Sequence, residues 1–247
     1  MFTQLEQHFN NTLQRFMTSA PLHKLASGAV SKREYASFLK QIFYIVRENP
    51  QLQTMATTQF RGRQRDYVRS FFQHATSEVG HDQLALNDIE ALGFNTHETP
   101  YRNPLPASVA LTGFAYHQIY NLNPLAHLGY IFFLEFLPTQ AGGVLTERLR
   151  EAGVPDNAMT FISDHIEIDV GHNRLMEQYI NALITNKADF DATCFAIDTT
   201  AYLYEQMISA AINDANEPVD TGWNWLELDA DGVTPDDLRR KTAASAA

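Results

Sequence analysis

The stretch Phe161-Ile-Ser-Asp-His165-Ile-Glu-Ile-Asp169-Val-Gly-His172 guides the interpretation of the whole chain. His165, Asp169 and His172 are separated by four and then three positions, so their side chains fall within about 60° of one face of an α-helix. The other side chains on that face are apolar: Phe161, Ile162 and Met176. Burying two imidazoles and a carboxylate together costs free energy unless something compensates them. The segment therefore predicts a helix that turns a metal-binding face toward a core.

The spacing of apolar residues predicts an all-α protein. They recur at intervals of three and four over most of the chain, whereas alternating polar and apolar runs are scarce. Ser31-Lys-Arg-Glu34 has the pattern of a capping box, so we expect a helix to begin there and continue over 35–48. Further helices are expected at about 2–18, 65–92, 107–121, 125–152, 156–184 and 190–215, with 125–152 bent at Pro138 or at Gly142-Gly143.

Composition excludes several classes of partner. The 247 residues include 18 Lys and Arg against 29 Asp and Glu, a net charge of -11, which disfavours nucleic acid and anionic membranes. A single cysteine, Cys194, leaves no internal disulfide and no Cys-rich metal site, as is usual in a reducing cytoplasm. The first residues lack a secretory pattern, and the longest apolar stretch, around 128–137, is too short to span a membrane and contains Glu135. We expect a cytoplasmic protein with a small-molecule substrate.

Residues 1–217 are predicted to form one domain, because no linker is strong enough to divide them. The tail, 218–247, differs in character. Trp223, Trp225 and Leu226 could anchor part of it onto the body, and its small, polar end is predicted to be disordered. A homodimer is expected because it is the commonest assembly of soluble homo-oligomers.

Two more of the expected helices carry ligand-type side chains. His74, Glu78 and His81 repeat the spacing of four and then three. Glu135 lies in the middle of a strongly apolar helix, where a lone carboxylate must be protonated, exposed or bound to a cation. Three helices that offer such groups to one interior match the way helical proteins hold two metal ions. Nitrogen and oxygen donors without a thiolate fit iron or manganese better than a structural zinc.

Simpler explanations exist for each element taken alone. Histidine pairs at helical spacing are common by chance, and for His74 alone a structural role is favoured. Glu135 could reach solvent at a bend near Pro138. For His165, Asp169 and His172 together, with apolar neighbours on the same face, metal binding is favoured by roughly two to one.

The order and spacing of these ligand-type residues resemble those of the heme-oxygenase-like diiron oxidases and oxygenases, within the superfamily of TenA-like and PqqC-like bundles. The residues that carry the resemblance are Glu78-x-x-His81, Glu135 and His165-x-x-x-Asp169-x-x-His172. The resemblance covers about 31–215. It implies a bundle of seven or eight helices around a central pocket. It also implies two Fe(II) ions, with manganese as an alternative, and six metal ligands that are also the catalytic residues: Glu78, His81, Glu135, His165, Asp169 and His172. His74 is outside the family pattern and is expected to orient a ligand.

The resemblance further implies an enzyme that activates O2 and oxidises a small amine, amino acid or carboxylic acid in specialised metabolism. The reactions of the group are N-oxygenation, oxidative C–C cleavage, desaturation and decarboxylation. Three carboxylates and three imidazoles neutralise most of the charge of two divalent ions and leave positions for O2. Arg47 could pair with a substrate carboxylate, although a solvated Arg beside Glu48 fits the sequence equally well.

Two other functions fit the same bundle. One is a metal-independent enzyme, either a thiaminase-type hydrolase with a cysteine nucleophile or a cofactor-free oxidase. Cys194 is the only thiol in this sequence. It lies in an apolar run, where a cysteine is usually buried and unreactive. The other is a non-enzymatic interaction protein that uses the bundle as a scaffold. A heme-binding version would need His8 or His23, and neither has a convincing context.

Overall fold

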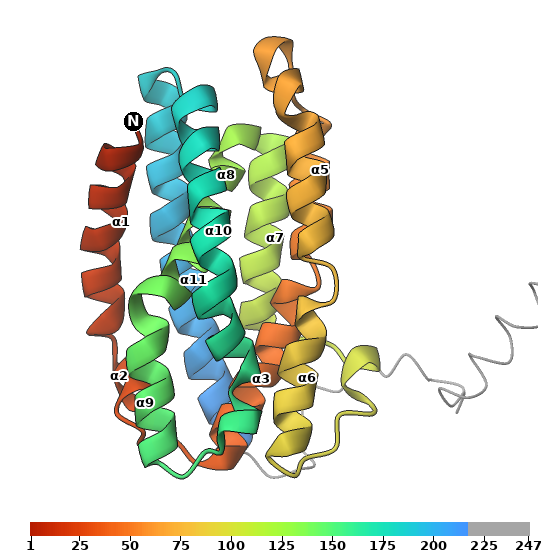
Figure 1. Ribbon diagram of the computed structural model, residues 1–247, viewed down its shortest axis with the longest axis vertical. Helices are drawn as coiled ribbons and strands as arrows, with labels where there is room; N and C mark the ends of the chain where they lie inside the picture. Colours follow the sequence, from red (N-terminus) through yellow and green to blue (C-terminus); the bar gives the residue numbers. More distant parts are fainter. Residues whose placement is uncertain (217–247) are drawn as a thin grey trace, which may run out of the picture.

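The structure is a computed structural model that describes residues 1–216, all of them in helices or connecting turns (Figure 1). The all-α prediction is confirmed for this part of the chain. Eight α-helices have ten or more residues, and three shorter ones connect them. In chain order the helices are α1 (Phe2–Met17), α2 (Ala20–Ala26), α3 (Lys32–Val46), α4 (Asn49–Thr57), α5 (Val68–Ser77), α6 (His81–Ala91), α7 (Pro106–Asn121), α8 (His127–Leu137), α9 (Gly143–Glu151), α10 (Thr160–Leu183) and α11 (Lys187–Asn216).

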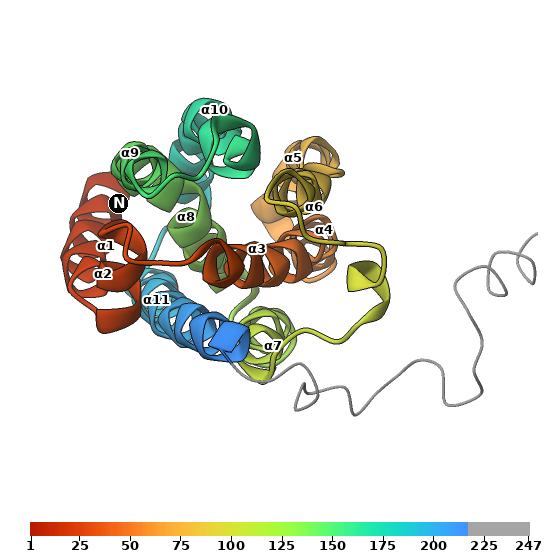
Figure 2. The same cartoon turned by 90° about the horizontal axis from the view of Figure 1, so that it is seen from below.

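Helices α3 and α8 form the centre of the bundle. In the view along the long axis they lie inside a ring made by the other helices (Figure 2). Nine of the eleven residues of α8 are buried, which fits a sequence that is apolar on every side. Gly129 lets α11 approach closely, because a Cβ there would lie 2.3 Å from the carbonyl oxygen of Thr193. The core helix α8 is thereby held against α11.

One stretch of the described residues, Pro124–Glu151, is long and apolar enough to cross a membrane by composition. It contains α8 and α9, and half of its most apolar window is buried inside the bundle. The ring of Phe9 on α1 packs against three α8 rings, Phe132, Phe133 and Phe136, with centroids 5.4 to 5.9 Å apart. Such packing is that of the core helix of a folded domain.

Several expected boundaries are confirmed. The capping box is present, with the Glu34 amide donating to Ser31 Oγ (3.2 Å) and the Ser31 amide donating to Glu34 Oε2 (2.8 Å). The expected 125–152 helix does change course at Pro138, where one turn of π-helix, Pro138–Gly142, separates α8 from α9. Pro50 begins α4.

The continuous helix expected over 65–92 is wrong. Helix α5 ends at Ser77 and α6 begins at His81, with Gly80 between them at φ +99°. This left-handed conformation ends a helix and suits glycine, which has no Cβ. His81 therefore starts a new helix and does not share a face with His74 and Glu78.

The predicted tail, 218–247, with Trp223, Trp225 and Leu226, lies outside the described residues. The single domain over 1–217 stays a prediction.

Candidate metal centre

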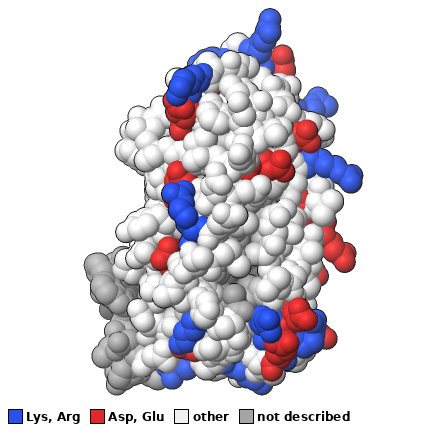
Figure 3. Space-filling view, turned by 90° about the vertical axis from the view of Figure 1, so that its left-hand side faces the viewer, with Lys and Arg blue, Asp and Glu red and all other residues white. Residues whose placement is uncertain are grey.

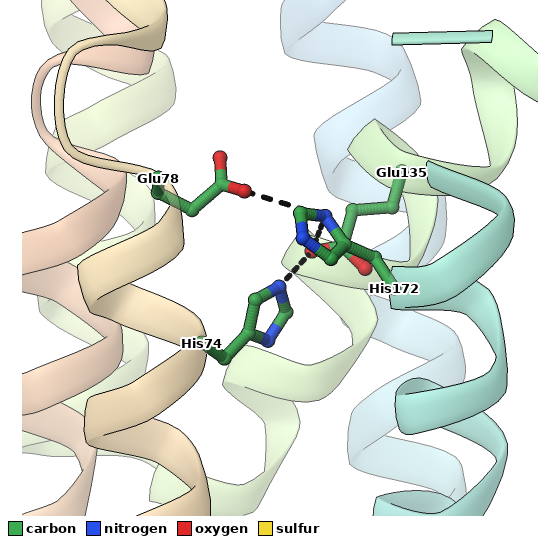
Figure 4. A group of neighbouring side chains, drawn as sticks. All are labelled: His74, Glu78, Glu135 and His172. Atoms are coloured by element: carbon green, nitrogen blue, oxygen red, sulfur yellow. Dashed lines mark ion pairs between the residues drawn. The ribbon is translucent and has the colours of Figure 1, made fainter. Parts of the chain in front are cut away.

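Three helices bring four ligand-type side chains together in the interior (Figure 4). His74 and Glu78 come from α5 and its end, Glu135 from α8 and His172 from α10. Each offers one ligand atom, and these four atoms all lie within 4.8 Å of one another. We call these four residues the four-residue centre.

The contacts within this centre are direct. His74 Nε2 lies 2.8 Å from Glu135 Oε1, and His172 Nδ1 lies 3.3 Å from Glu78 Oε1 and 3.8 Å from Glu135 Oε1. Local structure explains the placement, since His74 lies on the buried face of α5 with Phe71 and Ala75. Glu78 follows His74 by one turn, with its amide donating to the His74 carbonyl oxygen (3.3 Å).

Of the other three predicted ligands, His81 and Asp169 contact the four-residue centre, and His165 packs against His81. His81 Nδ1 lies 3.6 Å from Glu78 Oε2, and Asp169 Oδ1 lies 3.4 Å from His172 Nδ1. The ring of His165 has its centroid 5.1 Å from that of His81. His165 Nδ1 lies 2.6 Å from the carbonyl oxygen of Phe161, so this nitrogen carries the proton and Nε2 is left with a free lone pair.

Many polar atoms in this interior lack a hydrogen-bonding partner among the described residues. They include Glu78 Oε1, His81 Nδ1, Glu135 Oε2 and His172 Nδ1, and also His74 Nε2, which touches Glu135 without the angle of a hydrogen bond. Buried polar atoms in proteins normally have hydrogen-bonding partners, so a cluster of buried atoms without partners indicates a binding site for a ligand. Imidazole nitrogens and carboxylate oxygens are the donors that iron and manganese accept. The residues present therefore fit a metal ion.

Burial and neighbouring charges shift the pKa values in opposite directions. Burial raises the pKa of Glu135 well above its usual range, which favours the neutral carboxyl in the metal-free protein. Burial lowers the pKa of His74, which keeps its imidazole neutral, the form that binds a metal. Burial would also raise the pKa of Glu78, but His81, His172 and His74 together outweigh it and lower that pKa. A metal ion would hold the Glu135 carboxyl in its ionised form.

The structure places the sequence candidates in two groups. Glu78, Glu135 and His172 lie in the four-residue centre. His81 and Asp169 contact it, and His165 lies next to His81. His74 was expected only to orient a ligand, and its position inside the centre goes beyond that expectation. The signal was present in its spacing of four from Glu78, but no pattern in the sequence could show that Glu135 would face it.

Arg47 does not point toward this interior. Its guanidinium lies over the rings of Phe43 and Tyr44, at 5.4 and 5.0 Å from their centroids, and 3.5 Å from a Glu48 oxygen. This is the position expected of an Arg that pairs with Glu48.

A small apolar cavity of about 70 Å³ reaches the imidazole of His165. It lies between the N-terminal helices, the π-turn and α10. No Lys, Arg, Asp or Glu occurs in its described lining: Met17, Leu22, Leu25, Phe38, Leu137, Pro138, Ala141, Gly142, Val144, Leu145, Phe161, Ile162, His165, Tyr204 and Ile208. The site is therefore flanked by a space that suits an apolar group.

Solved structures similar to this one establish the fold. A domain of unknown function with a heme oxygenase-like fold from Shewanella denitrificans matches with a TM-score of 0.79 and 21% identity, covering 87% of this chain and 94% of that one. A TenA homolog from Pseudomonas syringae pv. tomato gives 0.68 and 12%, covering 85% and 92%. A TenA homologue from P. horikoshii gives 0.65 and 12%, covering 86% and 98%. The predicted heme-oxygenase-like bundle is confirmed.

The search of curated proteins gave no match. A family model does match, over residues 36–205, which is more than half of the chain and includes every residue of the candidate site. That family is described as iron-containing redox enzymes. With the bundle and its buried imidazoles and carboxylates in place, we conclude that this chain belongs to the family of iron-containing redox enzymes.

Proposed function

We propose that this protein is an O2-dependent oxidoreductase that uses two iron ions. The observation that carries the proposal is the four-residue centre, whose ligand atoms lie within 4.8 Å of one another in the core. His74, Glu78, Glu135 and His172 would hold iron there, together with their neighbours His81, His165 and Asp169. When bound, the iron pair would supply the electrons that reduce O2.

Other side chains of this protein would orient the metal ligands and exclude water. Asp169 Oδ1 lies 3.4 Å from His172 Nδ1, the nitrogen that also faces Glu78, so Asp169 would hold iron beside His172. Ser77 Oγ, 3.5 Å from Nε2 of the same imidazole, would orient the His172 ring. The carbonyl oxygen of Phe161 fixes the tautomer of His165 and leaves Nε2 available. The rings of α8 would keep bulk water from the site, because Phe132 and Phe133 are fully buried.

The cavity beside His165 supports a substrate with an apolar group. Among its described lining residues, only His165 could carry a charge, through protonation of its imidazole. An ionised group of a substrate placed there would lose its hydration without compensation. Among small amines, amino acids and carboxylic acids, we propose substrates with an aliphatic or aromatic side chain. Further parts of this proposal are a homodimer, a cytoplasmic location and a role in specialised metabolism.

Oxygen uptake by iron-loaded protein tests the proposal. Protein loaded with Fe(II) without oxygen would be mixed with aerated buffer and a panel of amines, amino acids and short carboxylic acids. Apolar members of the panel should accelerate O2 consumption at least fivefold over charged ones. The Ala141→Phe variant, which fills the cavity, should remove that acceleration while binding the same amount of iron. Equal O2 consumption by metal-free protein would contradict the proposal.

A metal-independent activity of the thiaminase type is less consistent with the site. Burial raises the pKa of the Cys194 thiol to about 11, and Asp198 and Asp191 add to this rise. A nucleophilic cysteine needs the opposite shift. A variant with Cys194→Ser that loses all activity while chelators have no effect would favour that class.

A further inference from the structure

The outward face of α5, with Arg65 from the 3-10 helix that precedes it (Gly62–Tyr67), carries a stripe of arginines and apolar side chains. Its residues recur at helical spacing and line a shallow open groove: Arg65, Val68, Arg69, Phe72, Gln73 and Thr76. Phe72 is 47% exposed and, with Val68 beside it, forms the apolar part of the groove. Helix α5 lies at the edge of the bundle, so this face is open to solvent (Figure 1). We call these six residues the α5 stripe.

The α5 stripe belongs to a basic segment in an acidic protein. Residues 61–69 contain four arginines and one acid, Asp66, while the whole chain has a net charge of -11. Arg61 donates to the carbonyl oxygens of Thr58 and Phe60. Within residues 1–216, Arg63, Arg65 and Arg69 have no carboxylate within ion-pair distance. These guanidiniums are available to a partner.

Other cations of the described chain are mostly neutralised in place. Ion pairs join Arg15 to Asp198, Lys24 to Glu34, Arg102 to Glu98, Arg148 to Glu151, Arg150 to Asp156 and Lys187 to Asp191. On the side of the bundle that includes α1 and α9, basic and acidic side chains are interspersed (Figure 3). An acidic partner would meet mixed charge there, whereas the α5 stripe attracts it.

The α5 stripe lies directly behind the four-residue centre. The inward face of the same helix carries His74, and Gln73 and His74 are adjacent in the chain. Ser77 Oγ donates to the His74 carbonyl oxygen (2.7 Å) and lies 3.5 Å from His172 Nε2. One helix, about 10 Å across, thus separates a partner on this face from the candidate iron ligands. The backbone of α5 connects the outward face, with the α5 stripe, to the inward face, with His74.

We propose that the α5 stripe is the docking site of an acidic one-electron carrier protein, of the ferredoxin type, that reduces the iron. This inference rests on the proposed function. Each docking transfers one electron: the carrier is oxidised by one electron and one ferric ion becomes ferrous. Two dockings reduce the pair, and no bond is made or broken. Complexes of this kind are small and transient, and arginine beside an exposed aromatic ring suits their interfaces.

Binding to the iron-free protein tests the docking site independently of catalysis. Calorimetric titration with oxidised plant-type [2Fe–2S] ferredoxin at low ionic strength should show binding that weakens with added KCl. The double variant R65Q/R69Q should bind about tenfold more weakly than the wild type. The matched control R148Q/R150Q removes two exposed charges from α9 and should bind like the wild type. Absence of wild-type binding, or equal loss in both variants, would overturn the proposal.

Reduction kinetics test the electron transfer. Reduced ferredoxin mixed with ferric-loaded protein should be oxidised about tenfold more slowly with R65Q/R69Q than with R148Q/R150Q. Dithionite, a small reductant that needs no docking site, should reduce all three proteins at the same rate. Equal ferredoxin rates would overturn the docking proposal while leaving iron binding intact. If the protein binds no iron, the proposed function fails instead. A change in oligomeric mass caused by R65Q/R69Q would assign the stripe to a second copy of this chain and overturn the proposal.

Discussion

The Nε2 atom of His74 lies 2.8 Å from Oε1 of Glu135, although the two residues are on different helices and 61 positions apart in the chain. Both side chains are buried. Burial lowers the pKa of His74 and raises that of Glu135, and both shifts favour the uncharged form in the metal-free protein. The contact with Glu135 therefore makes His74 a candidate metal ligand, as Glu78 and Glu135 are.

Replacing His74 should therefore impair metal binding. His74→Ala removes one of the four converging donors, and we expect iron affinity to fall by about tenfold or more. Iron content after equilibrium dialysis measures the effect. His117→Ala, which removes an exposed histidine on α7, is the control and should keep wild-type iron content. Wild-type iron content in His74→Ala would exclude His74 as a ligand.

Replacing Glu135 should separate stability from metal binding. Glu135→Gln keeps the shape of the side chain and removes the cost of a buried ionisable group, so the metal-free protein should be at least as stable to thermal unfolding. Iron content should fall sharply, because an amide is a poorer ligand than a carboxylate. Glu167→Gln, an exposed position on α10, should change neither property. A large loss of stability without loss of iron would show that Glu135 has a structural role.

The break between α5 and α6 should depend on the left-handed conformation that Gly80 adopts. It has φ +99°, and no heavy atom lies within 4 Å of the point where a Cβ would stand, so a steric clash is not the issue. Gly80→Ala should lower the free energy of unfolding by about 1–2 kcal/mol, because an alanine disfavours the left-handed region. Gly113→Ala, in the helical part of α7 with equal free space, should raise it by about 0.5–1 kcal/mol. Equal effects in denaturant melts would refute this conformational account.

Stability should fall in acid partly through Glu34. Burial alone would raise the pKa of Glu34, but hydrogen bonds from Lys24, Asn216 and Ser31 outweigh it and lower the pKa from 4.5 to about 2. Protons therefore bind the unfolded chain more readily, and this stabilisation is complete above pH 4.5 and lost as the pH falls toward 2. Glu34→Gln should flatten the loss of unfolding free energy between pH 4.5 and 2. An unchanged slope in urea melts would contradict the shift.

Local patterns in the sequence predict much of the fold. The capping box at Ser31 and the bend at Pro138 depend on a few neighbouring residues, and both occur as expected. The break at Gly80 was missed because a helical apolar pattern continues on both sides of it, and only the backbone shows its positive φ.

The candidate site was predictable in part for a similar reason. Helical spacing shows which side chains share a face, and it places Asp169 and His172 together, 3.4 Å apart in the structure. It does not show how three helices rotate against one another. That packing determines that His74 faces Glu135, and that Arg69 of α5 and Arg65 just before it face outward behind them.

The most direct measurement is an anaerobic titration of the metal-free protein with Fe(II), followed by separation from free iron and elemental analysis. We expect about two iron ions to be retained per chain in the wild type, and less than half of that in a variant combining His74→Ala with Glu135→Gln. Equal iron in both proteins, or retention of no iron by the wild type, would contradict this expectation.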